Sequence, residues 1–221
     1  MPVQPLEQYL KATTTKGEKL MAEEKYVAAS YTLPNKKFIN HYINLMKEHG
    51  SHLYIHAHNV AAYSEMIASE MGINEDVKTQ IVRGAFLHDI GKLSVPLEIL
   101  EKKEKLTEAD WKIIRRHPIS CLDLLPADIT KLELQIITMH HEKMDGEGYP
   151  FGINNISQEV FIVQTADIFD ALVSERAYKS VYSTEAAFDN LYDRVILAQM
   201  PEEPMAALER VIAKRYKGEA I

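Results

Sequence analysis

The stretch that most constrains this chain is residues 140–150, where two adjacent histidines run into a cluster of glycines and a proline. Upstream, apolar residues recur every three or four positions, and His140 is the next member of that helical stripe. His141 follows Ile137 by one turn, so both imidazoles are predicted to face the interior. The glycines and the proline then stop the helix and turn the chain. The pair can be metal ligands at the mouth of a pocket or hydrogen-bonded core histidines.

Helical periodicity recurs along the rest of the chain, and no segment has the alternation of a convincing strand. The predicted fold class is therefore all-α. One main domain is expected over residues 38–221, with residues 1–37 as an N-terminal appendage of helix and loop. Helices are predicted over residues 18–30, 38–46, 51–71, 75–87, 107–117, 129–140, 157–174, 184–200 and 203–217, and residues 97–105 are expected to form an amphipathic, charged and solvated face.

The composition excludes several kinds of partner. The net charge of −7 argues against a nucleic-acid polymer or a membrane surface, because either requires a basic face. An anionic substrate would need metal ions or a local basic cluster. The single cysteine, Cys121, excludes an intrachain disulfide and fits a reducing compartment. No apolar run has the length of a transmembrane helix, and the N-terminus lacks a signal peptide. A cytoplasmic protein is expected.

The predicted helix over residues 51–71 carries several histidines. Ile55, His58 and Ala62 share a face, so His58 is predicted to point inward, whereas His52 and His56 are not. A single histidine on an apolar face is more often a satisfied core residue than a ligand. The assignment of His58 as a ligand therefore depends on what lies near it.

Two further segments end on possible ligands. The helix over residues 75–87 leads into His88-Asp89, and an adjacent histidine and aspartate at a helix end can both reach one metal. The carboxylate of Asp89 can also bridge to a second ion. His117 precedes a proline, which disfavours helix at His117 and predicts a bend that can aim the imidazole into a cavity.

The helix over residues 157–174 contains Asp167 and Asp170, which lie on one side of an otherwise apolar helix. Buried unpaired carboxylates are costly, so a metal is a candidate partner for one of them. The candidate ligands with nitrogen or oxygen donors are His58, His88, Asp89, His117, His140, His141 and Asp167.

Seven ligands exceed the four of a structural zinc site and suit two ions bridged by a carboxylate. Such a pair, about 3.5–4 Å apart, activates water and stabilises the charge of an in-line phosphoryl displacement. The donor types suit Fe or Mn, with Ni, Co or Zn as alternatives. The competing interpretation is that these side chains are structural members of the core.

The combined motifs resemble the HD-GYP family, a branch of the HD metal-dependent phosphohydrolases. The resemblance covers about residues 38–180. It implies an all-helical bundle around a bridged metal centre that hydrolyses the bacterial second messenger cyclic di-GMP to the linear dinucleotide and GMP. The motifs that carry it are His88-Asp89-Ile90-Gly91-Lys92, His117-Pro118, His140-His141-Glu142, Asp145-Gly146 followed by Gly148-Tyr149-Pro150, and Asp167 to Leu172.

The resemblance also implies roles for individual residues. Asp89 would bridge the metals, and Lys92 would lie beside the reacting phosphate. Arg176 and Lys179 would contact substrate phosphates, and the loop Gly148-Tyr149-Pro150 could bind a protein partner. The alternatives are a hydrolase of another cyclic dinucleotide or nucleotide, and a receptor or adaptor that binds the dinucleotide without turnover.

The chain departs from the family pattern at a few positions. Cys121 replaces a frequent glycine, and Lys143 stands where arginine is common. Tyr54, one turn before His58, replaces an acidic ligand of some members. A neutral phenol is a poor ligand for a hard divalent ion, so two metals rather than three are predicted.

Overall fold

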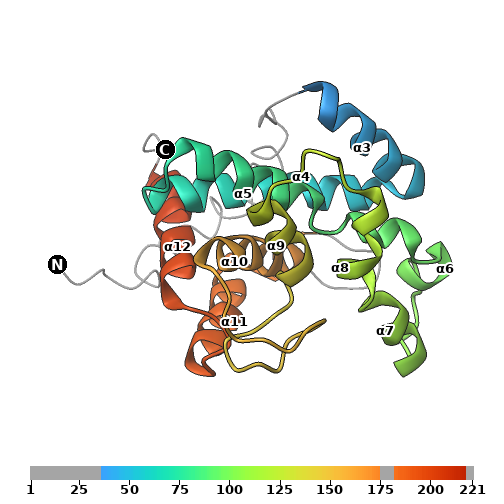
Figure 1. Ribbon diagram of the computed structural model, residues 1–221. Helices are drawn as coiled ribbons and strands as arrows, with labels where there is room; N and C mark the ends of the chain where they lie inside the picture. The colour runs from blue at the N-terminus through green and yellow to red at the C-terminus, as the bar shows by residue number, and fades with distance from the viewer. Residues whose placement is uncertain (1–35, 175–181, 218–221) are drawn as a thin grey trace.

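The computed structural model describes residues 36–174 and 182–217, and every regular element in these ranges is helical. The predicted all-α class is confirmed. The predicted helix over residues 18–30 and nearly all of the N-terminal appendage lie outside the described residues. In chain order (Figure 1), the elements are α3 (Lys36–His49), α4 (Ser51–Glu70), α5 (Glu75–Leu87), η1 (Ile90–Ser94), α6 (Leu97–Leu100), α7 (Glu108–Ile114), α8 (His117–Ser120), η2 (Leu122–Leu124), α9 (Lys131–Met139), α10 (Gln158–Val173), α11 (Thr184–Ile196) and α12 (Glu202–Lys217).

Local sequence sets several helix starts. Thr107 and Asp110 form the predicted capping box of α7, in which each side chain accepts a hydrogen bond from the other residue's backbone N–H. Thr130 and Glu133 do the same for α9. Within the amphipathic, charged stretch over residues 97–105, only the short helix α6 forms, and it ends at Leu100. None of its residues is buried, so no core contact supports a longer helix.

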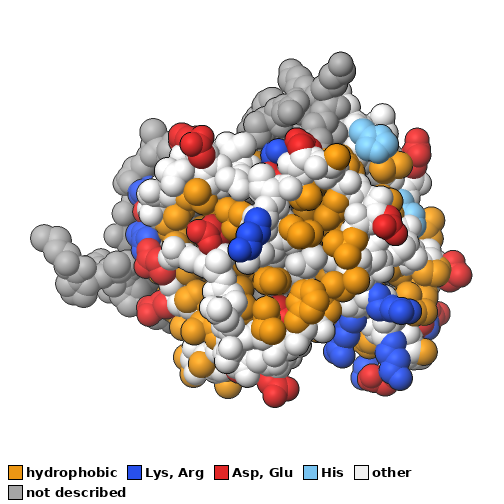
Figure 2. Space-filling model, in the orientation of Figure 1, with side chains coloured by type: hydrophobic (Ala, Val, Ile, Leu, Met, Phe, Trp, Pro, Cys, Tyr) orange, Lys and Arg blue, Asp and Glu red, His pale blue; other side chains and the backbone are white. Residues whose placement is uncertain are grey.

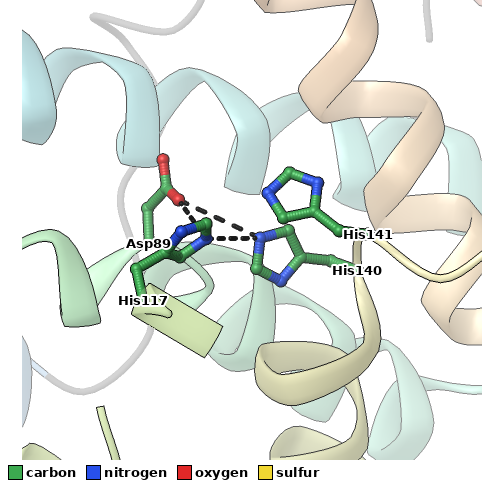
Figure 3. A group of neighbouring side chains, drawn as sticks. All are labelled: Asp89, His117, His140 and His141. Carbon is green, nitrogen blue, oxygen red and sulfur yellow. Dashed lines mark hydrogen bonds and ion pairs between the residues drawn. The ribbon is translucent and has the colours of Figure 1, made fainter. Parts of the chain in front are cut away.

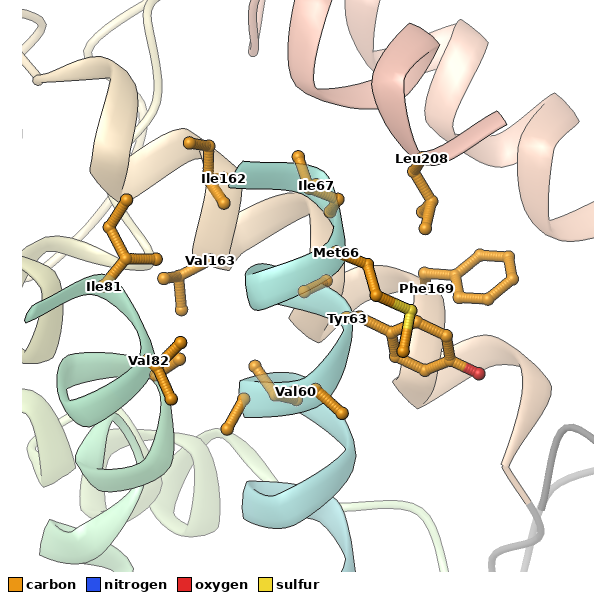
Figure 4. Packing of buried hydrophobic residues seen from close by; sticks show 14 of the residues in the cluster. Val60, Tyr63, Met66, Ile67, Ile81, Val82, Ile162, Val163, Phe169 and Leu208 are labelled. Atoms are coloured by element: carbon orange, nitrogen blue, oxygen red, sulfur yellow. The ribbon is translucent and has the colours of Figure 1, made fainter. Parts of the chain in front are cut away.

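Helix α4 is central to the core and packs against α5, α10, α12 and α3. Figure 4 shows buried side chains of α4, α5, α10 and α12 gathered in one cluster, with α4 between α5 and α12. Ala57 and Ala61 on α4 are fully buried, and their small side chains let the neighbouring helices approach closely. A similar close approach joins α5 to α9, since an added Cβ at Gly84 would lie 3.0 Å from the Ile136 side chain.

A tight backbone contact brings η1 against α8. A Cβ placed on Gly91 would lie 1.9 Å from the carbonyl oxygen of His117, so only glycine fits there. This contact places Asp89, which directly precedes η1, beside His117, the first residue of α8. In the described part of the chain, no helix is both long and apolar enough to cross a membrane.

Candidate metal centre

Two groups of histidine and aspartate side chains meet where α4, α5, α8, α9 and α10 converge. Within each group the possible ligand atoms lie within 4.8 Å of one another. The first group, drawn in Figure 3, brings together side chains from three separate parts of the sequence. Its members are Asp89, His117, His140 and His141, and the second group consists of His56, His88 and Asp167.

Asp89 lies between the two groups and faces both. Its Oδ1 is 3.2 Å from His117 Nε2 and 3.9 Å from His140 Nε2. Its Oδ2 is 3.4 Å from His88 Nε2 and 3.6 Å from His56 Nε2. The side chain is 1% exposed. One carboxylate oxygen therefore points towards each group, which is the arrangement expected of a bridging ligand.

The tautomers of three histidines follow from their backbone partners. Nδ1 lies 2.6 Å from Ala85 O in His88, 2.7 Å from Ile114 O in His117, and 2.9 Å from Ile137 O in His140. A carbonyl oxygen only accepts, so Nδ1 carries the proton in each neutral ring. Each Nε2 then presents a lone pair to the cluster, which is how metal-binding histidines are commonly oriented.

Burial keeps the first group of imidazoles neutral. It lowers the pKa of His117 to about 4 and that of His141 to about 3, and it lowers the pKa of His140 well below the usual range. The Nε2 atoms of His117 and His140 are 3.2 Å apart. Because both Nδ1 atoms are protonated, the two Nε2 lone pairs face each other and repel. A cation bound by both nitrogens would make this arrangement favourable.

His56 belongs to the second group and is held between two carboxylates. Its Nδ1 lies 2.6 Å from Asp170 Oδ2, and its Nε2 lies 3.0 Å from Asp167 Oδ1. Burial alone would lower its pKa, but the hydrogen bonds to Asp167 and Asp170 outweigh burial and raise the pKa to about 9, so a metal ion bound at Nε2 would displace a proton. Asn59 and Ser174 both donate to Asp170 Oδ1, which fixes the carboxylate that orients His56.

The prediction that His58, and not His56, points inward is wrong. His56 is 9% exposed, whereas His58 is half-buried and its ring lies 5.9 Å from that of Tyr54. His58 is in neither group. Ile55, which the predicted face included, is 53% exposed. No periodicity in the sequence separates His56 from His58, because α4 buries residues on several sides, among them Leu53, Ala57 and Val60.

The donor set fits divalent ions. Ligands bound about 2.1 Å from one ion at right angles to each other lie about 3 Å apart, and opposite ligands lie about 4 Å apart. The separations within the two groups, from 3.0 to 3.9 Å, fall in that range. Among the described residues, His88 Nε2 and Asp89 Oδ1 are buried without a hydrogen-bond partner. A metal ion would satisfy both atoms.

The loop after the paired histidines folds back on them. A Cβ on Gly148 would lie 2.4 Å from Glu142 Cα, so the loop backbone passes directly over that of residues 141–143. The Tyr149 ring stacks on His141 with centroids 4.6 Å apart. The fully buried Glu142 carboxylate accepts from the backbone N–H groups of Phe151, Gly152 and Ile153.

Sequence reasoning missed Gln164 of α10. Its amide nitrogen donates to His140 O at 2.9 Å and to Glu142 O at 2.6 Å, tying α10 to the end of α9. A glutamine within an apolar helix is the only sequence signal that could have marked it.

Lys92 contacts the centre directly. Its ammonium group donates to Asp89 Oδ2 at 2.5 Å, and it stays partly open to solvent. The predicted phosphate contacts Arg176 and Lys179 lie outside the described residues. Cys121, a departure from the family pattern, is fully buried, and its thiol lies 3.0 Å from Pro118 O. It packs under α8 and is not part of either group.

Comparison with known proteins identifies the family. The HD-domain profile ("HD domain") matches residues 40–195. The chain is 38% identical over 160 residues to the 3'3'-cGAMP-specific phosphodiesterase 3 of Vibrio cholerae, covering 71% of this chain and 35% of that protein. It is 35% identical over 185 residues to a cyclic di-GMP phosphodiesterase of Thermotoga maritima, covering 80% of this chain and 50% of that protein.

Solved structures share the fold. Bd1817, an HDG"Y"P protein of Bdellovibrio bacteriovorus, aligns with a TM-score of 0.60 at 18% identity, over 94% of this chain and 76% of that one. The HD domain of the phosphodiesterase PgpH of L. monocytogenes aligns with a TM-score of 0.62 at 18% identity, over 80% of this chain and 95% of that one. This chain spans only 35% and 50% of the two curated relatives named above. With the profile covering most of its length, the chain belongs to the HD-domain family.

Proposed function

We propose that this chain is a metal-dependent phosphodiesterase that hydrolyses a cyclic dinucleotide, with cyclic di-GMP as the first candidate and a linear dinucleotide or GMP as the product. The observation that carries the proposal is Asp89, whose two oxygens face two separate groups of neutral or carboxylate-paired ligands. Curated relatives at 35–38% identity are named as phosphodiesterases of cyclic di-GMP and 3'3'-cGAMP, which supports the substrate class.

The proposed centre holds two divalent ions. His117, His140 and His141 would hold one ion, and His56, His88 and Asp167 would hold the other, with Asp89 shared. Two such ions supply Lewis acidity and an activated water for in-line attack on a phosphodiester. The number of metal ions proposed, two, now rests on the two groups of ligands in the described residues. Tyr54 no longer bears on this number, because α4 places His56 in the cluster instead of His58. Fe or Mn remain the first candidates.

The chain's own residues prepare this chemistry. Burial by itself would raise the pKa of Asp89, but the Lys92 charge and the nearby histidines hold that pKa well below its usual range, so the carboxylate is ionised and able to bridge. Lys92 balances its charge and lies at the solvent side, where it can meet a substrate phosphate. Arg176 and Lys179 remain predicted phosphate contacts.

The Gly148-Tyr149-Pro150 loop remains a candidate contact for a protein partner. The Tyr149 ring packs inward on His141, so the exposed side chains that such a partner would meet are Met144 and Phe151. The cytoplasmic location, expected from the single cysteine, remains a prediction.

The test is product analysis with cyclic di-GMP, 3'3'-cGAMP and cyclic di-AMP, on protein loaded with Mn or Fe(II). We expect turnover of at least one cyclic dinucleotide, and Asp89→Ala is expected to lose metal and reduce turnover by several orders of magnitude while staying helical by circular dichroism. Binding of the dinucleotide without product would identify a receptor instead. Near-normal turnover in Asp89→Ala would exclude the bridged centre.

A further inference from the structure

A guanidinium lies beside the proposed centre and is assigned no role by the family motifs. Arg115 ends α7, two residues before His117. Its guanidinium carbon is 5.6 Å from the centroid of the Tyr149 ring. Because Tyr149 stacks on His141, only one aromatic ring separates this cation from a proposed metal ligand.

A second aromatic residue, on α7 itself, also contacts the Arg115 side chain. The Trp111 ring, one turn earlier, has its centroid 5.8 Å from the same guanidinium carbon, so the cation contacts two aromatic rings. The side chain is exposed, and no hydrogen bond or ion pair joins it to another residue of the described part of the chain. The neighbouring carboxylate of Asp110 is already engaged by Lys102 at 2.6 Å and by the backbone of Thr107. Arg115 is therefore oriented and available to an anion.

The charges around Arg115 also favour the binding of an anion there. The whole chain carries a net charge of −7, so an anionic substrate depends on local cations. Figure 2 shows Lys and Arg side chains gathered over α6 and α7, beside an area of hydrophobic side chains. Among the described basic residues of this region, Arg115 contacts the loop over the metal centre through the Tyr149 ring.

We propose that Arg115 binds the second, non-reacting phosphate of the cyclic dinucleotide while the metal centre holds the phosphate that is cleaved. A cyclic dinucleotide carries two phosphates joined in one ring, so a cation close to the reactive site can reach the other one. A guanidinium presents paired N–H donors that match two phosphate oxygens. This inference rests on the proposed function.

The test compares two substrates in the metal-loaded protein. Arg115→Ala is expected to raise KM for the cyclic dinucleotide roughly 10-fold or more with a smaller change in kcat, since the lost bond is charge-assisted. Hydrolysis of bis(p-nitrophenyl) phosphate, which has one phosphate, and the metal content are expected to stay within twofold of wild type. Arg116→Ala removes the same charge from the next residue and is expected to leave both KM values unchanged. Arg115→Lys is expected to recover only part of the loss.

Three outcomes would overturn the inference. An unchanged KM for the cyclic dinucleotide would show that Arg115 does not bind it. Equal losses with both substrates would mean that Arg115 only supports Tyr149, and an equal effect of Arg116→Ala would mean that the general surface charge is responsible. If wild type hydrolyses the dinucleotide and Arg115→Ala is normal, only this inference fails. If wild type neither hydrolyses nor binds any cyclic dinucleotide by calorimetry, the proposed function fails with it.

Discussion

Replacing Glu142 by glutamine tests the claim that this carboxylate holds the loop over the metal centre. Oε1 accepts from the N–H groups of Phe151 at 2.6 Å and Gly152 at 3.2 Å, and Oε2 accepts from that of Ile153 at 3.1 Å. A glutamine oxygen can keep the first two bonds, but its NH₂ group then faces the Ile153 N–H, donor against donor. Losing one charge-assisted bond and leaving a buried donor unsatisfied costs about 2–3 kcal/mol.

That loss is measurable by calorimetry. For a domain of about 150–250 residues, each kcal/mol lowers Tm by about 2–4 °C, so Glu142→Gln is expected to lower Tm by roughly 5–10 °C. Hydrogen exchange at the amides of residues 151–153 is expected to speed up. Glu147→Gln, an exposed site in the same loop, is the matched control and is expected to change neither measurement. A Tm for Glu142→Gln within about 1 °C of the control would refute the reasoning.

Three further predictions concern ligand orientation, backbone contact and helix docking. Asp170→Asn weakens the orientation of His56 and is expected to lower metal affinity roughly 10-fold or more in a chelator competition, whereas His58→Ala is expected to leave it unchanged. Gly91→Ala places a methyl group 1.9 Å from a carbonyl oxygen of α8. We expect this clash to lower the free energy of unfolding by about 1–3 kcal/mol in a urea titration and to lower the metal-to-protein ratio measured by mass spectrometry. Normal values in both measurements would contradict the contact. Burial would raise the Glu70 pKa, but the ion pairs with Lys214 and a neighbouring arginine of α12 lower it. Their contribution, at most about 1 kcal/mol, is present above the ordinary carboxyl pKa and is lost as the pH falls through the folded pKa. Glu70→Gln is therefore expected to lower Tm at pH 7, and the difference from wild type is expected to shrink as the pH falls below the ordinary carboxyl pKa.

Most of the candidate centre could be predicted because its ligands sit at the ends of helices. Asp89, His117 and His140 each come just before a local stop signal in the sequence, namely a glycine, a proline and a turn cluster. At a helix end the chain must leave the cylinder, so a ligand there is aimed by local geometry. The capping boxes at Thr107 and Thr130 are local for the same reason.

Only the tertiary structure decided which side chains of α4 face the metal centre. Leu53, Ala57, Val60 and Ile67 are all nearly or fully buried, because α5, α10, α12 and α3 pack around this helix on several sides. A helix that is apolar around much of its circumference has no single face for periodicity to find, so the sequence favoured His58 where packing selects His56. The same holds for Gln164 and Glu142, whose partners are backbone groups that only the folded chain brings within reach. The sequence by itself therefore determined the helices, the ligands at their ends and Asp167 within α10, whereas long-range packing decided that His56 rather than His58 completes the centre.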